Sequence, residues 1–190
     1  MSSSAPARRY GQGALATPAN LVTIARLVVA VPTLMLVHDE LSSWTTVALW
    51  FAITASDSLD GWLARRDGAT RSGAFLDPVA DKVIVLGGLG VLADLDVFPW
   101  WTVVVIGVRE LGISLYRSVA GRRGIVLPAQ RLGKYKAFLQ YLAVGSVLLP
   151  WTADWETAQA LVLYAATTLT VVSGLQIVRH GWVDWQRQDG

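Results

Sequence analysis

The chain has 190 residues, of which 53% are hydrophobic and 16% are charged, and its formal net charge at pH 7 is +2. This composition lies on the membrane side of the averages for soluble proteins. The sequence contains no cysteine, which excludes a disulfide framework, and its basic residues lie at the ends of apolar segments, which favours membrane topology over nucleic-acid binding.

Apolar segments of about twenty residues match the ~30 Å hydrocarbon core of a bilayer and predict transmembrane helices. There are six: Asn20–Val37, Trp44–Arg65, Gly73–Leu95, Pro99–Ala120, Leu132–Pro150 and Trp155–Val178. We therefore expect an all-α, polytopic membrane protein with one domain over residues 15–182. Residues 1–14 are small, polar and basic and are expected to form a disordered tail, and residues 183–190 form a second short tail.

Charge placement predicts the orientation of these segments. The loops after the first, third and fifth segments carry Asp and Glu but no Lys or Arg, whereas arginines collect on the other side. By the positive-inside rule, both termini and the loop between the second and third segments face the cytoplasm. Tryptophans at the predicted helix ends fit an aromatic belt: Trp44, Trp100, Trp101, Trp151, Trp155 and Trp182.

The first segment carries three polar residues near its start, Asn20, Thr23 and Arg26, at positions i, i+3 and i+6. Asn20 could be a helix N-cap and Thr23 could bond to its own backbone, or this end of the helix could meet a ligand. Arg26 is a charge inside an apolar run, so it either snorkels to the interface or pairs with an anion.

The second and third segments place aspartates and small residues on one face each. On the second segment the stripe consists of Asp57, Asp60, Gly61 and Ala64, and on the third of Gly73, Asp77 and Asp81. A lone Asp-x2-Asp pair is usually a solvated face, but here the pair is repeated in an apolar sequence. If the two helices form a hairpin, four carboxylates converge in one pocket, where burial requires compensating cations.

Carboxylate ligands alone suit hard cations, and four of them need about two divalent ions, Mg²⁺ or Mn²⁺. Zinc is disfavoured, because the sequence has no cysteine and only two histidines. Small residues leave room for a metal-bound phosphate, and Arg65 can bind an anionic oxygen with its planar fork. This equipment is typical of two-metal phosphoryl transfer.

Further polar residues lie on the fourth and fifth segments: Arg109, Glu110, Arg117, Lys134, Lys136 and Gln140. They could bind an anionic substrate. Arg109 and Glu110 could instead form a structural ion pair between helices, and the basic segment Arg122–Lys136 could anchor lipid headgroups. In the last segment, Ser173 and Gly174 are expected to pack helices rather than bind a ligand.

The pattern Asp57-x2-Asp60-Gly61-x2-Ala64-Arg65, then Gly73-x3-Asp77-x3-Asp81, resembles the signature of the CDP-alcohol phosphatidyltransferases. These integral membrane enzymes displace CMP from a CDP-linked lipid with an alcohol. The turn from Arg66 to Ser72 has seven residues, where the family usually has eight.

Two further patterns narrow the resemblance: Arg109-Glu110-x3-Ser114-x2-Arg117 and Gly133-Lys134-x-Lys136-x3-Gln140. With Leu76-Asp77-Pro78-x-Ala80-Asp81-Lys82, they resemble the bacterial phosphatidylglycerophosphate synthases of that family, over roughly Asn20 to Gln140. One position departs, since Ala137 stands where those enzymes often carry threonine.

The resemblance implies transfer of the phosphatidyl group from CDP-diacylglycerol to glycerol 3-phosphate, with Asp81 as the base. Two Mg²⁺ or Mn²⁺ ions would be bound by Asp57, Asp60, Asp77 and Asp81. The CDP-lipid would bind to Asn20, Thr23, Gly61, Ala64, Arg65, Thr70 and Gly73. The acceptor would bind to Arg109, Arg117, Lys134 and Lys136.

The resemblance also implies a homodimer in the bacterial cytoplasmic membrane, with the active site facing the cytoplasm. Two alternatives remain. The acceptor could be phosphatidylglycerol, giving cardiolipin, or inositol phosphate. A cation carrier could use the aspartates as its ion path.

Overall fold

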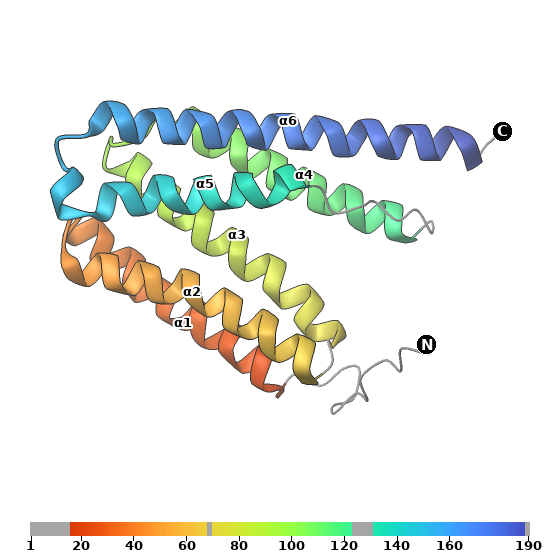
Figure 1. Ribbon diagram of the computed structural model, residues 1–190, viewed down its shortest axis with the longest axis horizontal. Coiled ribbons are helices and arrows are strands. Elements are labelled where there is room, and N and C mark those ends of the chain that lie inside the picture. Colours follow the sequence, from red (N-terminus) through yellow and green to blue (C-terminus); the bar gives the residue numbers. More distant parts are fainter. Residues whose placement is uncertain (1–15, 68–69, 123–130, 189–190) are drawn as a thin grey trace. The chain divides into compact units, whose positions relative to one another are not determined.

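The computed structural model describes residues 16–67, 70–122 and 131–188. Within these ranges the chain forms six α-helices and one short 3₁₀ helix, and no strand (Figure 1). The helices are α1 (Pro18–Asp39), α2 (Trp44–Asp67), α3 (Arg71–Asp94), α4 (Trp100–Arg122), α5 (Arg131–Leu148), η1 (Pro150–Thr152) and α6 (Glu156–Gln188). The prediction of an all-α fold is confirmed.

The predicted helix ends lie within two residues of the observed ends, with one exception. The last helix was predicted to end at Val178 but continues to Gln188. Residues 183–188, which were assigned to the C-terminal tail, are therefore helical. The end of an apolar run shows where the chain can leave the lipid. The helix itself continues as long as its backbone N–H and C=O groups form hydrogen bonds, so its end need not coincide with the end of the apolar run. The predicted tail over residues 1–14 lies outside the described residues.

Threonine caps the starts of α1 and α3. Thr17 Oγ1 accepts a hydrogen bond from the Asn20 N–H at 3.2 Å, and Pro18 opens α1. Thr70 Oγ1 accepts from the Gly73 N–H at 3.2 Å. Each cap satisfies a backbone donor that the first turn leaves unpaired. The alternative in which Asn20 caps the first helix is therefore wrong, since Thr17 has that role and Asn20 lies buried inside α1.

The described helices divide into two compact units, which we treat separately. The first consists of α1, α2 and α3 as far as Gly88, together with Leu148–Pro150. Here α1 and α2 lie side by side (Figure 1). A Cβ atom built on Gly87 of α3 would lie 2.6 Å from Leu34 Cδ1 of α1, so the glycine leaves room for the Leu34 side chain in its present position.

The interior of the first unit changes character along its helices. Its apolar part is formed by Ala30, Val37, Val47, Trp50, Ile53, Ala80 and Ile84, all buried. Asp57 follows Ile53 by one turn of α2, and Asp77 lies one turn before Ala80 and Asp81 on α3. The same inward stripes that are apolar at one end therefore become acidic at the other.

The second unit contains the rest of α3 with α4, α5 and α6. Helices α4 and α6 are in contact, and the rings of Trp101 and Tyr164 stack between them with centroids 5.9 Å apart. Gln140 Nε2 of α5 donates to Thr170 Oγ1 of α6 at 2.9 Å. These contacts join three helices through one stacked pair and one buried polar bond.

The surface of α1 is the reverse of that of a helix in a water-soluble protein. Four of its six buried residues are polar: Asn20, Thr23, Arg26 and Thr33. From Leu21 to Met35 its exposed large side chains are apolar, namely Leu21, Ile24, Val28, Val29, Val31 and Met35, and the exposed polar residues His38 and Asp39 lie only at its end. Soluble proteins bury apolar side chains and rarely expose such contiguous patches. This arrangement fits a helix whose outer face contacts lipid.

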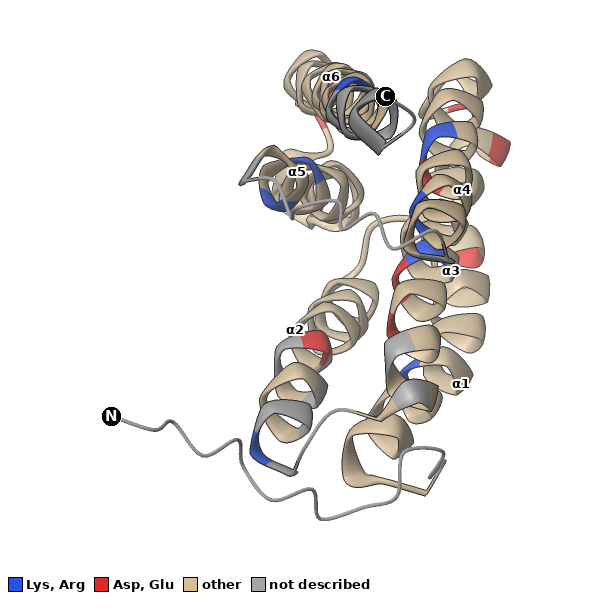
Figure 2. Cartoon of the chain, turned by 90° about the vertical axis from the view of Figure 1, so that its right-hand side faces the viewer, with Lys and Arg blue, Asp and Glu red and all other residues tan. Residues whose placement is uncertain are grey.

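By length and composition, two helical stretches of the described chain could cross a membrane, Pro18–Asp39 and Glu156–Arg179. Helices α2 to α5 carry more charged and polar residues, such as Arg109, Glu110 and Arg117 on α4. In Figure 2 the Lys, Arg, Asp and Glu residues of the described helices appear as short coloured bands between uncharged stretches. Six membrane-spanning segments therefore remain a prediction.

The predicted aromatic belt is exposed. Trp44, Trp100, Trp101, Trp151, Trp155 and Trp182 are each more than half exposed. The first five lie at or beside helix ends, whereas Trp182 lies inside α6 because that helix is longer than predicted. Exposed tryptophan at helix ends is typical of residues placed at the membrane interface.

Candidate functional site

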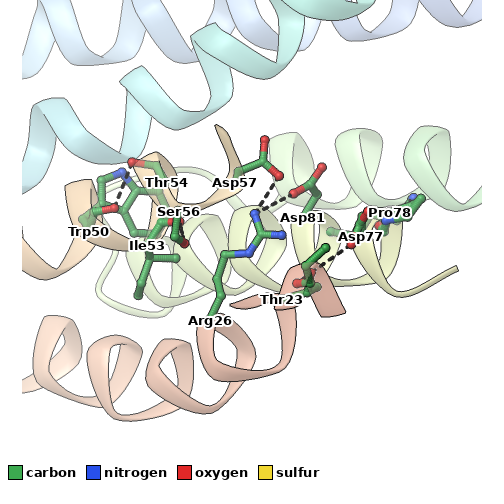
Figure 3. A network of polar contacts seen from close by, with 12 residues as sticks. Thr23, Arg26, Trp50, Ile53, Thr54, Ser56, Asp57, Asp77, Pro78 and Asp81 are labelled. Atoms are coloured by element: carbon green, nitrogen blue, oxygen red, sulfur yellow. Dashed lines mark hydrogen bonds and ion pairs between the residues drawn. The ribbon is translucent and has the colours of Figure 1, made fainter. Parts of the chain in front are cut away.

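Arg26 of α1 joins the two acidic helices of the first unit. Its Nη1 donates to Asp57 Oδ1 of α2 at 2.7 Å and lies 3.5 Å from Asp81 Oδ1 of α3 (Figure 3). The Arg26 side chain is only 1% exposed, whereas those of Asp57 and Asp81 are 44% and 46% exposed. Arg26 therefore pairs with an anion rather than snorkelling, and the anions are carboxylates of the chain itself.

Thr23 lies one turn before Arg26 on the same face of α1 and contacts the third motif aspartate. Its Oγ1 donates to Asp77 Oδ1 at 2.9 Å (Figure 3) and also lies 3.1 Å from the carbonyl oxygen of Ala19. The hydroxyl is completely buried. The predicted contact of Thr23 with its own backbone is therefore present, the bond to Asp77 was not predicted, and contact with a ligand stays a prediction.

Asn20 continues this polar stripe to the start of α3. Its Nδ2 donates to Ser72 Oγ at 2.9 Å, and Ser72 Oγ lies 3.1 Å from Thr70 Oγ1. A Cβ atom on Gly73 would lie 2.7 Å from Asn20 Oδ1. Glycine at this position therefore leaves room for Asn20 itself. Asn20, Thr70 and Gly73, which the sequence assigns to the CDP-lipid, pack together at the cap of α3.

The described side chains do not form a complete metal site, because no three Asp, Glu or His groups among them lie close enough to hold one ion. The chemistry of the donors nevertheless fits a hard cation. Asp57 and Asp81 share one guanidinium nitrogen, and both keep oxygens accessible. Their donors are carboxylate oxygens, as Mg²⁺ and Mn²⁺ prefer. Asp57, Asp77 and Asp81 could hold such an ion with Asp60, whose side chain lies outside the described residues.

Other predicted site residues lie on α2, near its end. Asp60, Gly61, Ala64 and Arg65 all belong to α2. The side chains of Asp60, Ala64 and Arg65 lie outside the described part of the structure, and so does that of Arg71 on α3. Their predicted roles in binding metal and CDP-lipid stay predictions.

A buried ionic cluster lies in the second unit. Glu110 Oε1 accepts from Arg109 Nη1 at 2.9 Å and from Lys136 Nζ of α5. Arg109 Nη2 donates to Ser173 Oγ of α6 at 2.7 Å. The side chains of Arg109, Glu110 and Lys136 are 11%, 14% and 11% exposed. Two of the four predicted acceptor residues thus meet on one carboxylate.

The other two predicted acceptor residues, Arg117 of α4 and Lys134 of α5, are exposed, and among the described contacts neither joins Glu110. Sequence reasoning assigned Ser173 and Gly174 to helix packing. This is confirmed for Gly174, where a Cβ atom would lie 3.1 Å from Arg109 Cγ. The bond from Arg109 to Ser173 was not predicted. A serine beside a glycine in an apolar helix was its only signal.

The chain is similar to a family of phosphatidyltransferases and to several proteins named as such. A sequence profile of the family described as CDP-alcohol phosphatidyltransferase matches residues 16–172. A probable phosphatidylglycerophosphate synthase of Mycobacterium tuberculosis (strain CDC 1551 / Oshkosh) is 39% identical over 184 residues, covering 92% of this chain and 86% of that protein. The CDP-diacylglycerol–glycerol-3-phosphate 3-phosphatidyltransferase of Bacillus subtilis (strain 168) is 36% identical over 138 residues, covering 70% and 72%. The protein of that name from Haemophilus influenzae is 35% identical over 145 residues, covering 74% and 78%.

Proposed function

Because the chain belongs to the CDP-alcohol phosphatidyltransferase family, we propose that it transfers the phosphatidyl group of CDP-diacylglycerol to glycerol 3-phosphate. The products are phosphatidylglycerophosphate and CMP. The acceptor is the one named in the curated relatives, two of which are 35% and 36% identical to this chain. Because members of this family are enzymes, the cation-carrier alternative is rejected.

The observation that best supports this function is the assembly of motif aspartates around α1. Asp57 of α2 and Asp81 of α3 both contact Arg26, and Asp77 bonds to Thr23. Burying these polar donors beside carboxylates in a protein with an apolar exterior costs free energy. Apolar side chains could pack the helices without that cost, so the cluster supports a functional role.

We assign the carboxylates of Asp57, Asp60, Asp77 and Asp81 to two divalent cations, Mg²⁺ or Mn²⁺. When bound, these cations supply positive charge that stabilises the charge spreading over the phosphate oxygens. Divalent metal use is general in the family. The number of ions and their identity are part of the proposal.

In the proposed reaction the sn-1 hydroxyl of glycerol 3-phosphate gives its proton to Asp81. The hydroxyl oxygen then bonds to the phosphorus that carries diacylglycerol, and the bond from that phosphorus to the CMP oxygen breaks. The side chain of Asp81 is 46% exposed, so the hydroxyl can reach its carboxylate. Gly61, Ala64 and Arg65 on α2 would bind the CMP moiety, since small residues allow close approach and the guanidinium pairs with phosphate.

The acceptor brings its own phosphate, which needs cationic partners. We assign Arg109, Lys136, Arg117 and Lys134 to this role. Arg109 and Lys136 are held in place by Glu110, and the planar guanidinium fork of Arg109, fixed in this way, suits the oxygens of a phosphate. Asn20, Thr23, Thr70 and Gly73, which the resemblance assigns to the CDP-lipid, would act chiefly by holding the start of α3 and Asp77 in position.

We further propose that all six helices cross the bacterial cytoplasmic membrane, with both termini and the aspartates on the cytoplasmic side. The apolar outer face of α1 and the exposed tryptophans support a lipid environment, and the arginine-rich loops support this orientation. Pairing of two copies is proposed from the family resemblance alone, and chemical crosslinking in native membranes would test it.

The function is tested by CMP release from CDP-diacylglycerol, using purified protein in detergent with Mg²⁺. Glycerol 3-phosphate, phosphatidylglycerol and inositol phosphate are offered in separate reactions. We expect release only with glycerol 3-phosphate, and none after addition of EDTA. Asp57→Asn should abolish turnover, whereas the matched change Asp154→Asn, in an exposed loop, should not. Release with another acceptor would overturn the acceptor assignment, and release with none would overturn the activity.

The absence of cysteine from the sequence allows a simple test of orientation. Single cysteines introduced as Asp154→Cys and Gln188→Cys are treated in intact cells with a thiol reagent that does not cross membranes. We expect labelling of the first from outside, and of the second only after the cells are opened. The reverse pattern would contradict the proposed topology.

A further inference from the structure

Arg26 has no part in the proposed reaction, yet among the charged side chains described in the first unit it is the most deeply buried. It lies on α1, two turns after the Pro18 start, and is 1% exposed. One guanidinium nitrogen reaches carboxylates from two other helices, at 2.7 Å and 3.5 Å (Figure 3). Such a side chain must be explained, because burying an arginine in an apolar protein is unfavourable unless its partners compensate.

The carboxylates of Asp57 and Asp81 likewise need a compensating charge of opposite sign. Asp57 and Asp81 lie close enough to share one nitrogen, and Asp77 lies one turn from Asp81 on α3. Negative charges at such short distances repel one another, and the buried guanidinium beside both of them offsets that repulsion. With no cation between them, the acidic ends of α2 and α3 would be driven apart.

We propose that Arg26 is a built-in counter-cation that holds Asp57 and Asp81 together before any metal binds, and that its charge sets the affinity of these carboxylates for divalent cations. It is a positioning residue. The inference rests on the proposed function only in taking these carboxylates as the cation site. Asn20 and Thr23, on the same face of α1, are neutral donors and cannot replace its charge.

Loss of Arg26 should change the stability of the metal-free protein and its affinity for divalent cations, each in a predictable direction. The metal-free protein becomes less stable, because the carboxylates lose their counter-charge. A divalent cation then relieves more repulsion and meets no neighbouring positive charge, so it binds more tightly. Loss of a metal ligand would act in the opposite direction on binding, so the two roles are distinguishable.

The experiment compares Arg26→Met, which keeps an unbranched apolar stem and removes the charge, with Arg26→Lys, which keeps the charge. Thr33→Val is the matched control, because Thr33 is buried on the same helix and its hydroxyl donates to Val29 of that helix at 2.8 Å. Melting temperatures of the purified full chain are measured in EDTA and in saturating Mg²⁺, and Mn²⁺ binding is measured by electron paramagnetic resonance.

We expect Arg26→Met to lower the melting temperature in EDTA by about 10 °C, and by much less in Mg²⁺. Its dissociation constant for Mn²⁺ should fall about tenfold. Arg26→Lys should stay close to the unaltered protein in both measurements. Equal loss of stability with and without metal, failure of lysine to restore it, or weaker Mn²⁺ binding in Arg26→Met would each overturn the proposal.

Arg26→Met could fail to fold, and a second variant covers that case. In Arg26→Met/Asp57→Asn one carboxylate charge is removed together with the cation. We expect this double variant to fold and to be more stable in EDTA than Arg26→Met alone. A double variant that is equally or less stable would overturn the proposal. If the unaltered protein binds no Mn²⁺, the proposed metal site fails, while the EDTA measurements still decide whether Arg26 is a counter-cation.

Discussion

The hydroxyl of Thr23 offers the sharpest test of how α1 supports the aspartates. It has one proton and two acceptors within reach, Asp77 Oδ1 at 2.9 Å and the Ala19 carbonyl oxygen at 3.1 Å. The carboxylate is nearer and charged, so the proton is expected to lie there. Thr23→Val keeps the branched shape but removes the donor, leaving Asp77 free to turn.

The expected effect is on the use of metal. A hydrogen bond to a charged group contributes about 1.5–3 kcal/mol, and removing a group that orients a metal ligand weakens metal binding about 10- to 100-fold. Thr23→Val should therefore raise the Mg²⁺ concentration for half-maximal CMP release by a factor in that range. The KM for glycerol 3-phosphate should change little, because Asp77, the carboxylate to which Thr23 donates, is assigned to the metal and not to the acceptor.

Thr33→Val is the control for this measurement. Thr33 is on the same helix and is as deeply buried, but its hydroxyl donates to the carbonyl oxygen of Val29 on its own helix. Its replacement should leave the Mg²⁺ requirement unchanged. If both variants raise that requirement equally, a general weakening of α1 explains the effect and the role assigned to Thr23 is wrong.

Two other changes test packing and charge. Gly73→Ala places a methyl group 2.7 Å from Asn20 Oδ1 and should destabilise the protein by about 1–3 kcal/mol. Gly90→Ala, where no described atom lies within 4 Å, should be neutral or slightly stabilising in thermal melts; equal melting temperatures for the two would contradict the packing. Glu110→Gln removes the carboxylate shared by two buried cations and should cost about 3–5 kcal/mol while raising the KM for glycerol 3-phosphate. The exposed Glu156→Gln should do neither, and an unchanged KM in Glu110→Gln would separate this cluster from the acceptor.

The helices could be predicted well from the sequence because lipid imposes a simple rule on them. A segment that lies in hydrocarbon must be apolar over about twenty residues, so composition alone marks most of the boundaries. The rule failed at the end of α6, which continues to Gln188. Beyond Val178 the chain becomes more polar, but its backbone goes on forming helical hydrogen bonds, and hydropathy carries no information about them.

The candidate site could be predicted in its residue types but not in its contacts. Periodicity placed the aspartates on stripes of two helices, yet it does not say which helix faces them. The partners of Arg26 therefore came only from the structure. Gly73 shows the same limit, since glycine indicates that some group approaches closely, and the sequence assigned that space to a ligand where the structure has Asn20.

Asn20, Thr23 and Arg26 of α1 explain why an acidic site formed by α2 and α3 in an apolar protein needs a third helix. The Oδ1 atoms of Asp57, Asp77 and Asp81 contact buried side chains of α1, and in a buried position hydrogen-bond donors must come from the chain. Thr23 and Arg26 supply them in different ways, since one is neutral and the other is charged. Their loss should therefore change the affinity for divalent cations in opposite directions, weaker for Thr23→Val and tighter for Arg26→Met. If α1 only packed against the site, both substitutions should change the affinity for divalent cations in the same direction.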